Sequence, residues 1–207
     1  MIRNTSIAII LSFAISLSAR NIHEQPRDCD APVPILVNGT WGFIDHTGKI
    51  IIEPQFKGAG YFSEGLATVA VGKQGGYINR RGEWVIKPSS LNSSSFSEGF
   101  APFRQNDKYG YIDKTGKIVI PLQFDRAQPF SEGLAAVYMR SKSKYGYIDK
   151  TGTMVIPLQF DHAEPFCGGL ARVDMGHLIR DRLDGEHFEG KFGYINTKGE
   201  YIWKQTE

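Results

Sequence analysis

The chain has 207 residues and a formal net charge of +2, from 24 basic and 22 acidic residues that are mixed along its length. No basic stripe is present, so the electrostatic footprint of a nucleic-acid-binding surface is missing. With 22% charged and 41% hydrophobic residues, the composition is that of a folded globular protein and excludes a disordered chain.

The first 19 residues have the pattern of a secretory signal peptide. Arg3 precedes an apolar run from Ile7 to Leu17, and small residues follow up to Ala19. The run is too short for a membrane span, and the small residues offer cleavage sites. We therefore expect a secreted or periplasmic protein with no membrane span after signal removal. Residues 20–32 are predicted to form a polar leader.

After the leader, one pattern returns along the rest of the chain: an aromatic residue, Gly, a second aromatic residue, Ile, and then Asp or Asn. Its glycines are at positions 42, 76, 110, 146 and 193, so the spacings are 34, 34, 36 and 47. A period of this size indicates a repeat architecture. We expect one domain over 33–203, made of five units at about 33–52, 66–86, 100–120, 134–156 and 170–203.

Each unit is predicted to be a three-stranded antiparallel meander. In the third unit the first strand covers Phe100 to Arg104, and the repeated pattern from Tyr109 to Asp113 forms the middle strand. Asp113 and Gly116 then have the spacing of a type I turn, in which the carboxylate accepts local N–H groups and Gly takes positive φ. The equivalent aspartates and asparagines in the other units are therefore interpreted as turn residues.

The third strands are continuous apolar runs such as Ile118-Val119-Ile120. A strand that is apolar on both faces is normally covered on both faces. We therefore expect small sheets stacked on one another, so that Ile51, Val119 and Val155 are shielded. The predicted fold is all-β, with the five meanders arranged as a propeller-like ring or as a curved array.

Connectors of 13 residues separate the units, and Phe-Ser-Glu-Gly recurs in three of them, at 62–65, 96–99 and 130–133. We expect the phenylalanines to fill the gap between successive sheets. Glu64, Glu98 and Glu132 are predicted to cap backbone N–H groups where the chain passes into the next sheet.

Together, the aromatic-Gly-aromatic-Ile-Asp run, the apolar third strand and the following Phe-Ser-Glu-Gly-Leu-Ala resemble the WG repeat, also called the KWG repeat. The resemblance covers about 33–203. It implies a bacterial, often exported, β-rich module for binding or interaction, and it supplies no catalytic residues. The chain departs from the pattern at Gly75, where an aromatic residue is expected, and at Cys167-Gly168, which replaces Ser-Glu. The fifth unit also carries an insertion near 176–190.

The insertion holds the one cluster of polar residues outside the repeat. Its histidines and carboxylates offer metal ligands, although their spacing matches no known loop and a solvated hairpin tip has the same composition. We expect neither a metal nor a cofactor. The residues concerned are His177, Asp181, Asp184, Glu186, His187 and Glu189.

Four aromatic residues share one repeat position, namely Trp41, Tyr109, Tyr145 and Phe192. If they are exposed, they form a candidate binding platform for sugar rings or peptide segments. The alternative is that each packs against the neighbouring sheet.

Cys29 and Cys167 are the only cysteines, and both fall at the repeat phase of Ser63 and Ser131. In an exported chain a disulfide is the expected state of such a pair. A bond requires Cα atoms within about 7 Å. We therefore predict a Cys29–Cys167 disulfide, which favours closure of the five units into a ring.

These observations predict an exported, monomeric, non-catalytic module that mediates interactions with a protein or a cell-envelope polymer. The alternative is a carbohydrate-binding, lectin-like repeat protein. A hydrolase is a third class, and it lacks an acid, base or nucleophile that breaks the repeat outside the insertion.

Overall fold

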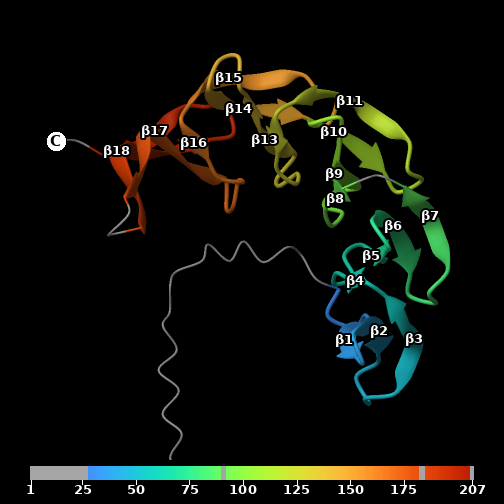
Figure 1. The fold of residues 1–207 in the computed structure, drawn as a ribbon. Coiled ribbons are helices and arrows are strands. Elements are labelled where there is room, and N and C mark those ends of the chain that lie inside the picture. The colour runs from blue at the N-terminus through green and yellow to red at the C-terminus, as the bar shows by residue number, and fades with distance from the viewer. Residues whose placement is uncertain (1–27, 90–91, 182–184, 206–207) are drawn as a thin grey trace, which may run out of the picture.

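The computed structural model describes residues 28–89, 92–181 and 185–205, and this part of the chain consists of strands and connecting turns. The predicted signal peptide over 1–19 lies outside the described residues, as does the leader up to residue 27. The strands form five small antiparallel sheets. Figure 1 shows the sheets following one another in chain order along an open arc, with the first and last sheets at opposite ends. The described sheets do not close into a ring.

The first sheet contains Val33–Val37 (β1), Thr40–Ile44 (β2) and Ile50–Phe56 (β3). The second contains Gly58–Ala59 (β4), Leu66–Val71 (β5), Gln74–Asn79 (β6) and Trp84–Ser89 (β7). The third contains Asn92–Ser93 (β8), Phe100–Gln105 (β9), Lys108–Asp113 (β10) and Ile118–Phe124 (β11). The fourth contains Arg126–Ala127 (β12), Leu134–Met139 (β13), Lys144–Asp149 (β14) and Met154–Phe160 (β15). The fifth contains His162–Ala163 (β16), Leu170–Asp181 (β17), Gly185–Asn196 (β18) and Tyr201–Lys204 (β19).

Four of the sheets have one strand more than the predicted meander, because each connector contributes a two-residue strand to the sheet that follows it. β4 pairs with β5, β8 with β9, β12 with β13 and β16 with β17. Around β4 the pairing continues on both sides, since Lys57 N–H donates to the Ala70 carbonyl and Gly60 N–H to the Thr68 carbonyl, both at 2.8 Å. The connectors are therefore partly strands, and not only the loops that the sequence pattern indicated.

The glycine of the repeated pattern lies where the second and third strands approach most closely. In the third sheet, Tyr109 pairs with Phe124 and Tyr111 with Ile120, so β11 bulges opposite Gly110. A Cβ atom on Gly110 would lie 2.5 Å from the Ile120 carbonyl oxygen. In the other four sheets the equivalent separation is 2.6 or 2.7 Å. No side chain fits at this position without moving the backbone of the third strand.

The predicted turns are confirmed. Asp113 Oδ1 accepts hydrogen bonds from Thr115 N–H at 2.9 Å and Lys117 N–H at 3.1 Å, and Gly116 has φ +85°. This glycine also contacts the preceding sheet, because its Cβ position lies 3.2 Å from the Ile86 side chain. The turn therefore serves both the hairpin and the packing between sheets.

The apolar core is divided into four clusters, and each cluster lies between two successive sheets. Between the third and fourth sheets, the rings of Tyr111 and Phe130 are 4.8 Å apart, and the Tyr111 hydroxyl donates to the Gln128 carbonyl at 2.7 Å. The connector phenylalanines are fully buried, as predicted. The sheets are thus held together by the connector that passes between them.

The predicted caps by the connector glutamates are also confirmed. Glu64 accepts from Gly99 N–H at 3.0 Å, and Glu98 accepts from Gly133 N–H at 3.0 Å. The same two carboxylates form ion pairs with Lys114 at 3.0 Å and Lys150 at 3.1 Å, which are turn residues of the next sheet. Carboxylates that accept backbone N–H groups form strong, charge-assisted hydrogen bonds. These contacts link each connector to the next one along the arc.

The prediction that the third strands are covered on both faces is wrong. Ile51 and Val155 are each 42% exposed and Val119 is half-buried, whereas Ile52, Ile120 and Ile156 are buried. β3, β7, β11 and β15 lie on the outer side of the arc (Figure 1). Because the sheets fan out towards that side, only one residue of each predicted apolar run in the first four sheets is covered, the one that faces the turn glycine of the next sheet.

Candidate functional site

Each sheet contains one pair of facing residues whose chemistry differs from sheet to sheet. The pair joins the first and second strands of the predicted meander, on the side of the hairpin that connects them. We call it the variable pair. One member is the predicted platform position, and the other lies opposite it on the first strand. The pairs, in chain order, are Leu36 and Trp41, Ala70 and Gly75, Arg104 and Tyr109, Tyr138 and Tyr145, and Asp174 and Phe192.

The predicted platform residues do not form a row of free rings. Tyr145 is buried, Trp41, Tyr109 and Phe192 are half-buried, and Gly75 interrupts the series in the second sheet. Tyr145 packs against Tyr138 with ring centroids 4.9 Å apart. Most of the surface of these rings is therefore packed against other residues of the chain and is not open to a ligand.

From the third sheet onwards, cations lie beside these rings. The Arg104 guanidinium lies 6.0 Å from the centre of the Tyr109 ring, and the Arg126 guanidinium lies 5.8 Å from that of Tyr138. These separations fall in the range of cation–π contacts. The series continues in the fifth sheet, where Arg172 lies 4.6 Å from the centre of the Phe192 ring.

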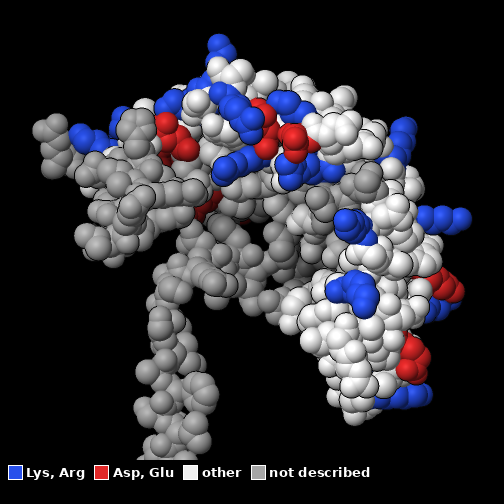
Figure 2. Space-filling model, in the orientation of Figure 1, with Lys and Arg blue, Asp and Glu red and all other residues white. Residues whose placement is uncertain are grey.

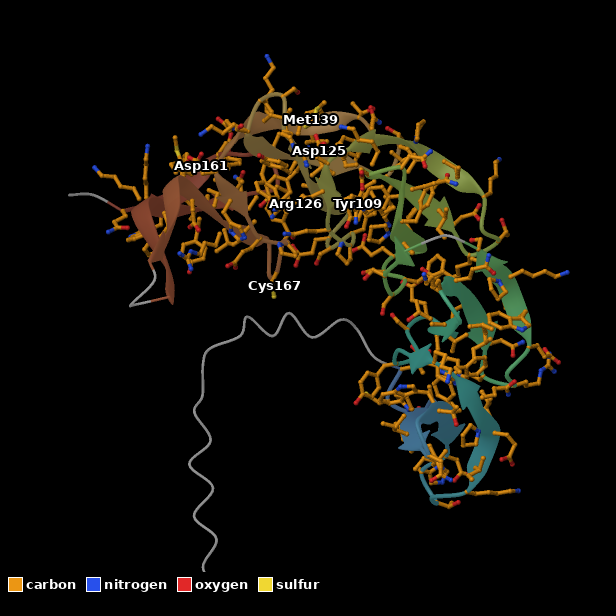
Figure 3. The ribbon with its side chains drawn as sticks, viewed as in Figure 1. Tyr109, Asp125, Arg126, Met139, Asp161 and Cys167 are labelled. Atoms are coloured by element: carbon orange, nitrogen blue, oxygen red, sulfur yellow. The ribbon has the colours of Figure 1, made fainter. Side chains whose placement is uncertain are left out.

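Some of these arginines and rings line a cleft between the third and fourth sheets. The cleft extends to the start of the fifth sheet. Its volume is about 790 Å³. Figure 3 shows Tyr109, Asp125 and Arg126 grouped at the middle of the arc. The lining residues are Arg104, Asp107, Tyr109, Asp125, Arg126, Ala127, Gln128, Arg140, Tyr145 and His162.

The two carboxylates of the cleft already have partners. Asp125 accepts from the Lys108 ammonium at 2.8 Å and from Arg140 backbone N–H at 2.8 Å, and these bonds lower the pKa of Asp125 below its ordinary value. Asp107 pairs with Arg104. Within the described residues, the guanidinium groups of Arg126 and Arg140 form no ion pair. The cleft therefore presents a surplus of positive charge.

A buried carboxylate lies beyond the cleft, in the fifth sheet. Asp174 is 5% exposed, pairs with Arg172 at 3.1 Å, and lies 3.6 Å from His162 Nδ1. Burial raises the pKa of Asp174, and the Arg172 guanidinium acts against that increase. We did not single out Arg126, Arg140 or Asp174 from the sequence. Comparison of the five units at the variable pair, at the hairpin loops and at the connector strands would have found them, because the chemistry there changes between units.

The insertion of the fifth unit extends the β17–β18 hairpin, whose pairing continues to Asp181 and Gly185. The side chains of the predicted polar cluster, from His177 to Glu189, lie outside the described residues. Among the described residues, no three side chains of His, Cys, Asp or Glu are grouped as a metal site. No helix in the described chain has the length and apolar character that crossing a bilayer needs.

The sequence was compared with known families and proteins. A family described as "WG containing repeat" matches residues 41–73, 76–109, 109–142 and 145–176, which together cover more than half of the chain. The chain belongs to the WG repeat family. The glycine of the WG pattern is the one that the third strand approaches at 2.5–2.7 Å, so the family's pattern is explained by this contact.

No curated protein matches the WG repeat chain. Among solved structures, a protein of unknown function from Bacteroides caccae is 14% identical, with a TM-score of 0.34 over 84% of this chain and 93% of that one. Virginiamycin B lyase from Staphylococcus aureus is 17% identical, with a TM-score of 0.41 over 84% and 69%. A streptogramin B lyase is 13% identical, with a TM-score of 0.43 over 88% and 82%. Likeness at this level carries no argument about the activity of the WG repeat chain.

The predicted Cys29–Cys167 disulfide is absent, and both side chains are exposed. Successive connectors contact each other one step at a time, as when the Ser63 hydroxyl donates to the Phe96 carbonyl at 2.7 Å. Residues that occupy the same position in successive units therefore lie one sheet apart along the arc. Cys29 precedes β1 and Cys167 lies between β16 and β17, so the open arc separates them (Figure 1).

Proposed function

We propose that this WG repeat chain is an exported, non-catalytic interaction module that binds another protein along the outer side of its arc. The observation that carries this proposal is a set of exposed apolar residues that recurs on the third strand of every sheet, which we call the outer rim. Exposed apolar patches of this kind mark interaction surfaces. The outer rim consists of Ile50, Ile51, Trp84, Val85, Ile118, Met154, Val155, Tyr201, Ile202 and Trp203.

The outer rim favours contact through side chains over addition of a strand. Each third strand is an unpaired edge of its sheet, and such an edge normally invites pairing with another chain. Four of these edges contain a proline, namely Pro54, Pro88, Pro121 and Pro157. Proline lacks the N–H group that strand pairing needs. A partner with an apolar face of its own therefore fits the rim better than an extended peptide.

The proposal has two further parts, which concern export of the protein and the number of repeats. The signal-peptide pattern in residues 1–19 supports a secreted or periplasmic location, where a monomer with an uncovered rim meets its partner. We also propose that β16–β19 is a fifth, divergent repeat. Its strands have the order and pairing of the preceding sheets, although the family match ends at residue 176.

A photo-crosslinking experiment in the source cells tests the proposed interface. A photoreactive residue at Val155, in the outer rim, is expected to give a discrete protein adduct in the exported fraction. The same residue at Lys142, an exposed position in the β13–β14 hairpin, provides the matched control. The change Ile118→Lys should reduce the Val155 adduct about tenfold, since a charge placed in an apolar contact costs more than 1.4 kcal/mol. Equal adducts from both positions, or none from Val155, would contradict the proposal.

Carbohydrate binding is a second candidate function. The observation that favours it is that two predicted platform residues, Tyr109 and Tyr145, line the same cleft. Aromatic rings with polar neighbours suit the faces of sugar rings. Trp41 and Phe192 do not line this cleft, so only half of the predicted platform contributes to it.

A further inference from the structure

We propose that the cleft between the third and fourth sheets binds an acidic oligosaccharide, a chain of sugar rings that carries carboxylate groups. This inference rests on the second candidate function and is independent of the outer rim. It identifies a site in the molecule and the chemical class of ligand that the site would take.

The first argument is where the units differ. Residues that recur in every unit maintain the sheets. A side chain that occurs in one unit only is not needed for the fold and is therefore a candidate for binding. In the first two sheets the variable pairs are Leu36 with Trp41 and Ala70 with Gly75, which carry no charge. In the third sheet the pair is Arg104 with Tyr109, and in the fourth it is Tyr138 with Tyr145, where Arg126 supplies the charge beside the Tyr138 ring. Figure 2 shows Lys and Arg side chains gathered over the middle of the arc, with Asp and Glu side chains among them, whereas charged side chains are more widely spaced over the part formed by β1–β6.

The second argument is the surplus of positive charge. Arg126 and Arg140 extend from different elements, β12 and the β13–β14 hairpin, into the lining of one cleft. Asp125 is held by Lys108 and by Arg140 backbone N–H, and the Arg140 charge also stabilises this carboxylate, but neither guanidinium group forms an ion pair with it. Guanidinium groups bind carboxylates through paired, charge-assisted hydrogen bonds. A ligand that carries carboxylates would supply ion-pair partners for Arg126 and Arg140.

The third argument is that the cleft combines apolar ring surface with unmet polar groups. Tyr109 remains half-buried and Tyr145 also lines the cleft. Gln128 Nε2 donates to the Ala163 carbonyl at 3.1 Å, while its Oε1 is buried and has no hydrogen-bond partner among the described residues. This oxygen is covered by protein atoms, so it can accept a ligand hydroxyl group only when the Gln128 side chain rotates towards the cleft. Sugar rings provide an apolar face for a tyrosine and hydroxyl groups for an amide.

An acidic peptide is the competing ligand, and the backbone geometry disfavours it. Extended peptides gain affinity by adding a strand to an exposed sheet edge. The edge strand at the cleft, β12, has only two residues. A peptide would therefore have to bind through its side chains alone. The cleft volume of about 790 Å³ lies within the range of pockets that hold small molecules and short oligomers.

Calorimetric titration of the full chain tests the inference with three probes: a hexamer of galacturonic acid, the same hexamer with its carboxylates methyl-esterified, and hexaglutamate. The acidic hexamer should bind, and the ester and the peptide should bind at least tenfold more weakly. Arg126→Ala and Arg140→Ala should each weaken the acidic hexamer about tenfold. Both side chains are exposed, so these variants are expected to fold.

Lys73→Ala is the matched control, because Lys73 is an exposed cation in the hairpin of the second sheet that corresponds to the Arg140 hairpin. It should leave the affinity unchanged. Absence of binding by the acidic hexamer, equal binding of the ester or of hexaglutamate, or equal losses in the Lys73 and Arg126 variants would each overturn the inference. Ile118→Lys in the outer rim should not alter this titration, so failure of the proposed partner interface is distinguishable from failure of the sugar site.

Discussion

The glycine that follows the first aromatic residue of each second strand is required by contact with the backbone of the third strand. It is not a turn residue, and it does not need positive φ: Gly110 is absent from the residues with left-handed φ. Its role is to let the bulged segment around Pro121 approach. A glycine with this role is needed in every sheet for the same reason, which explains why it is the most regular feature of the sequence.

Gly110→Ala should therefore be strongly destabilising. The added Cβ would lie 2.5 Å from a carbonyl oxygen, and forcing such a contact in a packed sheet costs about 2–3 kcal/mol. Gly58→Ala is the control, since its Cβ would make an ordinary contact at 3.5 Å with Ala70. We expect Gly58→Ala to change the free energy of unfolding by less than about 0.5 kcal/mol. Urea denaturation of both variants measures the difference, and equal midpoints would refute this explanation of the WG glycine.

At the scale of the element, the connectors decide how one sheet follows another. Each connector places a phenylalanine in the core between two sheets, and the first three place a carboxylate on the next connector. In the fourth connector, Cys167-Gly168 replaces Ser-Glu. Gly168 has φ +63°, and Glu64, Glu98 and Glu132 have φ between +53° and +54°. The left-handed backbone is therefore common to all four connectors, whereas the glutamate side chain is present in three of them.

Two substitutions at Glu98 separate the side-chain contact from the backbone strain. Glu98→Ala should destabilise the protein by about 1 kcal/mol, because it leaves Gly133 N–H without its carboxylate. Glu98→Gly removes the same contact and also relieves the left-handed φ, so it should be about 1 kcal/mol more stable than Glu98→Ala. Thermal unfolding of the two variants gives the comparison. If the glycine variant is the less stable of the two, the left-handed backbone is not a source of strain at this position.

At the scale of the whole molecule, the open arc explains the two predictions that the structure corrects. The sheets fan out on the outer side, which leaves Ile51 and Val155 exposed and creates the outer rim. The same opening separates the first sheet from the fifth, which removes the condition for a Cys29–Cys167 bond. A closed ring would have altered the second result, because ring closure brings the first and last sheets together.

The arc predicts two accessible thiols in the exported protein. Iodoacetamide treatment of the native chain without a reductant should add two alkyl groups to the intact mass, one at Cys29 and one at Cys167, since both are exposed. The variant Cys167→Ser should take up one group and keep the melting temperature of the unmodified chain. An unmodified mass that changes only after reduction would show that the ends meet, and it would contradict the open arc.

The repeat pattern alone determined the three main strands of each unit, where the turns lie and which glutamates cap the next connector. These features depend on contacts within one unit or between successive units, and the sequence displays the pattern up to five times. The turn aspartates could be assigned in this way from a single chain, whereas the connector strands and the close approach at the WG glycine could not. The exposed rim, the separated cysteines and the convergence of Arg126 and Arg140 on one cleft were decided only by the tertiary structure. They depend on the angle between successive sheets, which is set by the packing of different side chains at each interface and leaves no periodic trace in the sequence.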